Sequence, residues 1–182
     1  MKFLIVAALL VATVSAKSVK INSLTNCGGP GAPITFSGSI LTDPVAVPGQ
    51  MLMDLTTVAG VAATAGDGLM VRKVTTRTAD NYQVPCFNGI SGTCTVNFCD
   101  ALVTYPDAVC SIFPPGVACS CPVEAGTYHA PDAFVTFEAD WLAINGGVAG
   151  DYTSRTQIIS SLGAPNELIL GCIDVSFTLF AA

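Results

Sequence analysis

The residues best suited to chemistry in this chain are one histidine, a few carboxylates and eight cysteines. The histidine, His129, would need an adjacent nucleophile and an orienting acid to act as a general base, and Asp132 lies close to it in the sequence. The nearest approach to a Gly-x-Ser-x-Gly nucleophile turn is Gly89–Thr93, which lacks the last glycine. We therefore interpret His129 as an ordinary surface or turn residue.

A carboxylate pair is the second catalytic candidate. Glu138 and Asp140 occupy alternate positions, which lie on one face of a strand and leave a glycosidase-type arrangement open. The sequence contains no glycine loop of the phosphate-binding type and no calcium-binding loop. We expect that the protein is not an enzyme, and we keep a hydrolase acting through Glu138, Asp140 or His129 as the alternative to test.

The eight cysteines are better explained by disulfides than by a metal. Their number is even, and behind a signal peptide this predicts four disulfides, for which 105 pairings are possible. Cys27 and Cys172 lie near the two ends of the mature chain, and a bond between them would contribute about 5 kcal/mol in the loop-entropy model, about twice as much as a local Cys86–Cys94 bond. Zinc requires well-spaced Cys or His pairs, and the chain offers only Cys119-Ser-Cys121 and one histidine. We expect no metal and no cofactor.

The first sixteen residues have the pattern of a secretory signal peptide. A positive start at Lys2 precedes an apolar run from Phe3 to Val14, and Val14–Ala16 is a small-residue cleavage site. The run is shorter than the roughly 18 apolar residues of a membrane-spanning helix. We predict a signal peptide over residues 1–16 and a single secreted domain over residues 17–182.

The composition excludes one class of partner and leaves two interpretations of the apolar residues open. Loss of Lys2 with the signal peptide changes the formal net charge from −6 to −7, so the chain lacks the basic surface that nucleic acids require. Charged residues make up only 11% of the chain, whereas soluble domains average about a quarter. Such a chain has either a well-filled core with a Thr/Ser/Gly-rich surface, or apolar area that it offers to a ligand or membrane.

Strand patterns dominate the chain. Ile173, Val175, Phe177 and Leu179 alternate with polar residues and predict a strand with one apolar face. Pro131 predicts an edge position or a break within an extended segment at Gly126–Phe137. The remaining predicted strands cover Val19–Leu24, Ile34–Leu41, Gln50–Val58, Leu69–Arg77 and Asp151–Leu162.

Two segments depart from this pattern. Phe98 and Leu102 indicate a short helical turn within Val96–Val103, and the proline- and cysteine-rich stretch Tyr105–Pro122 predicts a disulfide-stapled loop. The whole predicts a single all-β domain, as a sandwich or an open cup.

An apolar, aromatic run leads into the glycine-rich loop Asn145–Gly150. Its tryptophan, Trp141, either caps the core or belongs to an apolar lip that enters a membrane, where the amphipathic indole ring is favoured. The residues that we assign to a lipid cavity and its lip come from this run and from the last strand: Phe134, Val135, Phe137, Trp141, Leu142, Ile144, Ile173, Val175, Phe177 and Leu179.

Several motifs together resemble the ganglioside activators, lysosomal sphingolipid activators that serve β-hexosaminidase, within the MD-2-related lipid-recognition class. All eight cysteines have counterparts, and the similar stretches run in order through almost the whole mature chain. They are Val45-Ala-Val-Pro-Gly49, Val84-Pro-Cys86, Cys94-Thr-Val-Asn-Phe98-Cys99-Asp100, Cys119-Ser-Cys121-Pro-Val-Glu124-Ala-Gly-Thr-Tyr128, Trp141-Leu142, Gly150-Asp-Tyr152 and Gly171-Cys172-Ile173.

The resemblance implies a β-cup, two sheets held apart around a large apolar cavity, with a mobile lid at roughly Val135–Leu142. It also implies the disulfides Cys27–Cys172, Cys86–Cys94, Cys99–Cys121 and Cys110–Cys119. The chain departs from the family in the spacing of its cysteine cluster, in a longer glycine-rich stretch after Trp141, and in having no Asn-x-Ser/Thr glycosylation site.

The implied function is a non-enzymatic lipid carrier. Such a protein extracts a glycosphingolipid or phospholipid from a membrane that it touches transiently, then transfers the lipid or presents it to a soluble glycosidase. The alternative is an extracellular lipid sensor or innate-defence module that retains its lipid and docks on a receptor. Either protein would be secreted or would reside in the lysosomal lumen.

Overall fold

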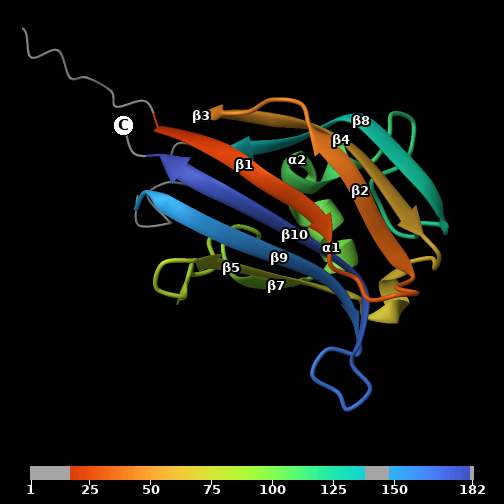
Figure 1. Cartoon of the computed structure of the whole chain (residues 1–182). Coiled ribbons are helices and arrows are strands. Elements are labelled where there is room, and N and C mark those ends of the chain that lie inside the picture. The colour runs from red at the N-terminus through yellow and green to blue at the C-terminus, as the bar shows by residue number, and fades with distance from the viewer. Residues whose placement is uncertain (1–16, 138–147, 181–182) are drawn as a thin grey trace, which may run out of the picture.

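The computed structural model describes residues 17–137 and 148–180, and their strands form two layers that face each other (Figure 1). Within each layer, neighbouring strands pair antiparallel. The first layer contains β1 (Lys17–Asn26), β10 (Leu168–Phe180), β9 (Gly150–Ser160) and β5 (Met70–Arg77), and the second contains β2 (Ile34–Ile40), β4 (Gly49–Ala59) and β8 (Gly126–Phe137). Three short strands lie at the edges of the first layer: β3 (Val45–Val47) beside β1, and β6 (Tyr82–Gln83) and β7 (Cys94–Asn97) beside β5.

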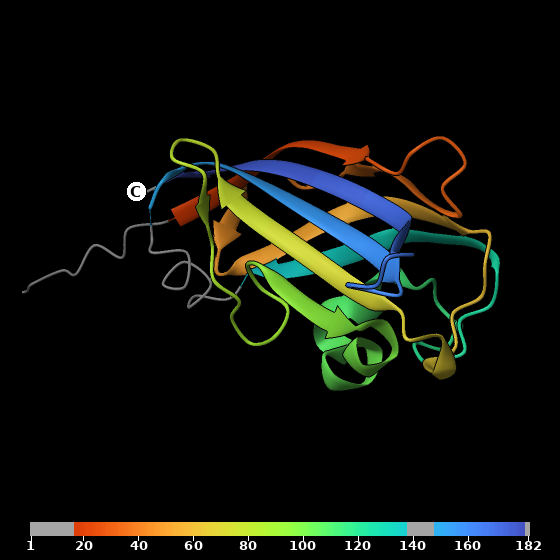
Figure 2. The same ribbon diagram turned by 90° about the horizontal axis from the view of Figure 1, so that it is seen from below.

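The two layers meet at one seam, where β10 and β2 pair in parallel at Gly171 and Ile34. A Cβ atom on Gly171 would lie 2.8 Å from the Cβ of Ile34, which is closer than non-bonded carbon atoms can pack. Glycine is therefore required for this close approach, and the layers diverge on either side of the seam (Figures 1 and 2).

A helical segment connects the far edges of the two layers. It contains α1 (Phe98–Thr104), α2 (Pro106–Val109) and the 3-10 turn η2 (Cys110–Ile112), and another 3-10 turn, η1 (Ala65–Asp67), precedes β5. The Asn97 side chain caps α1 by accepting a hydrogen bond from the Asp100 backbone N–H at 3.1 Å. Ser111 donates to the Phe134 carbonyl at 2.5 Å, so the segment that begins at β7 ends packed on β8 (Figure 2). Of the two predicted architectures, a sandwich and an open cup, the structure is thus the cup.

The strands form because apolar and polar residues alternate along them. In β4, Met51, Met53 and Leu55 are buried between the layers, and the residues between them face outward. The outward face of the first layer is polar: Asn22 donates to Thr178 and Arg155 pairs with Asp174 across the strands. The main core lies between the layers and consists of Val19, Ile21, Val45, Val47, Met51, Met53, Leu55, Val84, Ala130, Ala133, Phe137, Tyr152, Phe177 and Leu179.

Four disulfides are present, and they are the pairs that the resemblance implied. Cys27–Cys172 joins the end of β1 to the middle of β10, across 145 residues of sequence. Cys99–Cys121 joins α1 to the segment before β8, and two local bonds, Cys86–Cys94 and Cys110–Cys119, close loops on either side of the helices.

The predicted all-β class is confirmed, and so are the strands that carry long alternating patterns. The helical turn falls at Phe98–Thr104 rather than Val96–Val103, since Val96 and Asn97 still belong to β7. The stretch Tyr105–Pro122 is stapled as expected but also contains α2 and η2, which the prediction missed. Pro131 lies in an edge strand whose register against β4 shifts between Ala130 and Ala133, so it marks both an edge and an irregularity. Residues 1–16, the predicted signal peptide, lie outside the described residues.

Candidate functional site

Among the residues that the structure describes, the candidate catalytic groups do not come together as a recognisable active site. His129 Nε2 lies 2.8 Å from Asp54 Oδ1, so its acid partner is Asp54 of β4 rather than Asp132. The two side chains are about half exposed to solvent, at 55% and 44%, on the outward face of the second layer. Ser91 belongs to the connection between β6 and β7, which is part of the first layer. Glu138 and Asp140 lie outside the described residues.

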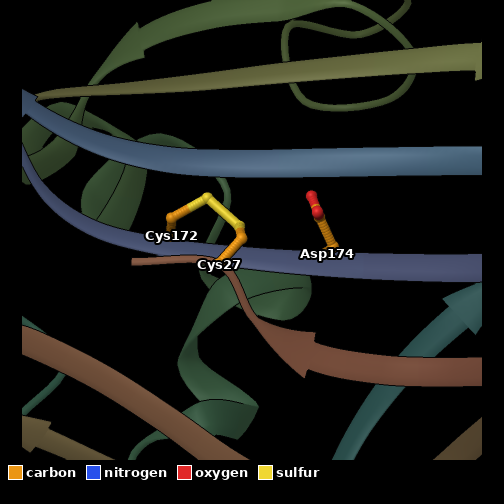
Figure 3. Close-up of side chains that lie close together, drawn as sticks. All are labelled: Cys27, Cys172 and Asp174. Carbon is orange, nitrogen blue, oxygen red and sulfur yellow. A yellow bond between two sulfur atoms is a disulfide. The ribbon is translucent and has the colours of Figure 1, made fainter. Parts of the chain in front are cut away.

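One cluster in the described part of the chain has three side chains of metal-ligating type: Cys27, Cys172 and Asp174 (Figure 3). The two sulfur atoms are bonded to each other and therefore offer no thiolate. The Asp174 carboxylate accepts two hydrogen bonds from Arg155, at 2.9 and 2.8 Å. The cluster is accordingly a disulfide beside an ion pair.

The interior of the cup, between the two layers, is the most distinctive site. Its side chains are apolar, but several of them are only half-buried. Phe177 and Leu179 on the inward face of β10 are buried, at 6% and 2% exposure. Ile173 and Val175 lie on the same face of the same strand and are only half-buried. Since β10 is flanked by β9 and β1, their remaining exposure must lie on the inward side.

Other inward-facing residues show the same incomplete burial. In a filled core, side chains that point between two sheets are packed at crystal-like density and lose contact with solvent. Here the half-buried apolar residues come from both layers and from the helical segment: Leu24, Phe36, Ile40, Val71, Val96, Phe98, Ile112, Val135 and Ile158.

The inward face of β5 and β9 adds polar groups to this apolar interior. The hydroxyl groups of Thr75 and Ser154 are buried and lie 3.1 Å apart, and Thr75 also donates to the Gly92 carbonyl at 3.1 Å. Lys73 lies on the same face of β5 as Thr75, two residues away, and burial lowers its pKa. Sequence patterns did not identify these residues, because only the strand pairing shows which face of β5 is inward.

One end of the cup carries exposed apolar side chains. The chain leaves β8 at Phe137, re-enters at Val148 before β9, and leaves β10 at Phe180. Val148 and Phe180 are 43% and 44% exposed, and Tyr82 at the neighbouring β5–β6 turn is 46% exposed. Trp141, Leu142 and Ile144, the predicted lip, fall between Phe137 and Val148 and lie outside the described residues.

The structure brings together some of the predicted cavity residues and separates one. Val135 and Phe137 face the interior with Val175, Phe177 and Leu179, and all five belong to or pack against the main core. Phe134 alternates with them and lies on the opposite face of β8, where it pairs with Leu52. Its assignment to the cavity therefore stays a prediction without support from the strand geometry.

A two-layer all-β cup with four disulfides and a half-buried apolar interior has the features of the MD-2-related lipid-recognition class, in agreement with the sequence motifs. No protein-family model matches the chain. Among characterised proteins, the chain is similar to the Ganglioside GM2 activator of Mus musculus, with 28% identity over 166 residues that cover 86% of this chain and 81% of that protein. The predicted resemblance to the ganglioside activators is thereby confirmed. No helix among the described residues is long and apolar enough to cross a membrane.

Proposed function

We propose that the protein is a non-enzymatic lipid-binding activator, secreted or lysosomal, that is cleaved after residue 16. In this proposal the cup takes up the hydrocarbon chains of a glycosphingolipid or phospholipid from a membrane. The headgroup stays accessible to solvent, and the lipid is transferred to another membrane or presented to a soluble glycosidase. The observation that carries the proposal is the half-buried inward face of the cup, to which β10 contributes Ile173 and Val175.

Physical chemistry makes such a site effective without a specific residue for each contact. Each buried CH₂ group contributes about 0.8 kcal/mol, so two long acyl chains bind tightly through area alone. The low charge content leaves few side chains that would have to be desolvated when a lipid enters. The exposed Val148 and Phe180 at one end of the cup offer apolar surface to a membrane during loading.

The relative supports the same role. The mouse protein is named Ganglioside GM2 activator, and its similarity extends over most of both chains.

The proposal is tested by replacing Val175 with a residue that occupies the interior. In a filled core, Val175→Trp would overpack and cost about 1–3 kcal/mol or more. In a hollow, the indole ring fills free space, so we expect Val175→Trp to retain its thermal stability and to lose at least tenfold in the rate of fluorescent phosphatidylcholine transfer between vesicles. Leu179→Trp, at a fully buried position of the same face, is the matched control and should unfold at a lower temperature.

Two outcomes would contradict the proposal. A Val175→Trp variant that transfers lipid as fast as the wild type would show that lipid does not occupy this interior. Turnover of a glycolipid by the purified protein alone would show that it is a hydrolase. Slow lipid exchange with retained binding would instead favour the sensor that keeps its ligand.

A further inference from the structure

Lys73 is a cation on the inward face of the cup. Val74 and Thr76, which alternate with Lys73 and Thr75 along β5, line a shallow hollow on the outward face with Arg155 and Asp174. Because side chains alternate along a strand, Lys73 must point the opposite way, as the buried and hydrogen-bonded Thr75 does. Lys73 is half-buried, and burial lowers its pKa.

Strand pairing aligns Lys73 with Ile173, one of the half-buried apolar residues of the inward face. Lys73 pairs with Thr156 of β9, and Thr156 pairs with Ile173 of β10. Two strand spacings therefore separate Lys73 from Ile173, about 10 Å along the inner wall. On its other side Lys73 pairs with Cys94, whose sulfur atom is bonded to Cys86 and does not titrate.

Lys73 differs from the arginines of the first layer in having no acidic partner among residues 17–137 and 148–180. Arg72, Arg77 and Arg155 each form an ion pair, with N···O distances of 3.2, 2.6 and 2.8 Å. The Lys73 ammonium group donates only one described hydrogen bond, to the Ile90 carbonyl at 3.5 Å, which is a long contact.

This contact does not account for the lysine as a structural residue. The loop that contains Ile90 is already attached to β5 by shorter bonds, from Thr75 Oγ1 to the Gly92 carbonyl and from Thr93 Oγ1 to the Thr75 carbonyl. An ammonium group that is partly removed from water and lacks a counter-ion is unfavourable, whereas the same group paired with an anion is not. Methionine would fill the same volume at this position without that cost.

We propose that Lys73 binds the anionic oxygen atoms of a lipid whose hydrocarbon chain lies along Ile173 and Val175. The ligand is an acidic amphiphile, and a carboxylate or a phosphate group would supply the oxygen atoms. This inference rests on the proposed function, since it names the chemical class of ligand that the same interior prefers. Its energetic basis is a charge-assisted hydrogen bond in a site with few competing water molecules.

The experiment compares one ligand with and without its charge. cis-Parinaric acid carries a fluorescent hydrocarbon chain and a carboxylate, and its methyl ester has the same chain without the charge. We expect the wild type to bind the acid at least about tenfold more tightly than the ester. Lys73→Met should weaken binding of the acid by about tenfold and leave binding of the ester unchanged, and Lys73→Arg should keep the preference for the acid.

Two further variants serve as controls. Lys73→Gln removes the charge but retains a donor for the Ile90 carbonyl, so it should behave as Lys73→Met does and remains informative if the methionine variant fails to fold. Lys20→Met removes an exposed charge from the outward face of β1 and should bind both probes as the wild type does. Millimolar inorganic phosphate should not displace the acid, because the hydrocarbon chain supplies most of the affinity.

The outcomes separate this inference from the proposed function. Equal binding of acid and ester by the wild type, or an equal loss of both in Lys73→Met, would overturn the role of Lys73 and leave a lipid-binding cup. Displacement of the acid but not the ester by phosphate would show that the site takes a free anion, which also overturns the inference. Failure of the wild type to bind either probe would overturn both the inference and the proposed function.

Discussion

The residues around the turn that joins β5 to β6 form a compact charged corner. Arg77 donates to both carboxylate oxygen atoms of Asp80, at 2.9 and 2.6 Å, and its guanidinium group lies 5.1 Å from the centre of the Tyr82 ring. The hydrogen bond from Arg77 is the main cause that lowers the pKa of Asp80 from 3.8 to about 2. The contacts of Arg77 with Asp80 and Tyr82 therefore hold the turn between β5 and β6 in place.

The lowered pKa predicts an acid dependence of stability. Because the folded pKa of Asp80 lies below the unfolded value, its stabilising contribution is present above pH 3.8 and is lost as the pH falls towards 2. We therefore expect Asp80→Asn to be less stable than the wild type at pH 7 and this difference to shrink between pH 4 and pH 2. Urea unfolding at a series of pH values measures it, and a difference that stays constant over this range would contradict the prediction.

At the scale of elements, long patterns could be predicted and short ones could not. The alternation of Ile173, Val175, Phe177 and Leu179 was sufficient to assign β10 and its inward face. β3, β6, β7 and α2 are two to four residues long, too short for a period to be visible, and they depend on pairing and disulfides rather than on local preference.

Lys73 and Phe134 show the same limit for the candidate site. Both lie in predicted strands, but the face on which each residue lies follows from register, which the sequence does not reveal. The pairing of β5 with β9 turns Lys73 inward, and the alternation of β8 turns Phe134 away from Val135 and Phe137.

The disulfides connect elements over very different lengths of chain, and this predicts unequal contributions. Cys27–Cys172 closes a loop with a sequence separation of 145, against 9 for Cys110–Cys119. In the loop-entropy model, replacing the first pair by alanines costs about 5 kcal/mol and replacing the second costs about half of that. Denaturant unfolding of the two double variants tests the ranking. Equal losses would show that the long bond does not act mainly on the unfolded chain.

At the scale of the whole molecule, the two faces of the first layer differ in the polarity and burial of their side chains. Its outward face is covered by hydrogen bonds between strands, such as Ser23 with Ser176 and Thr178 with Asp151. Its inward face is apolar. Phe177 at one end belongs to a packed core, whereas Ile173 and Val175 further along β10 are only half-buried. The low charge content was compatible with a well-filled core or with apolar area offered to a ligand, and the incomplete burial of single inward side chains leaves no direct pattern in the sequence.

The central claim is that this interior holds a lipid, and native mass spectrometry tests it most directly. The purified protein would be measured before and after incubation with vesicles that contain phosphatidylcholine, a ganglioside and a fatty acid. We predict a bound species with the mass of one protein chain plus lipid, reduced in Val175→Trp, and a protein mass eight hydrogen atoms below that of the reduced chain because of the four disulfides. A correctly folded, oxidised protein that carries no lipid and acquires none would contradict the account.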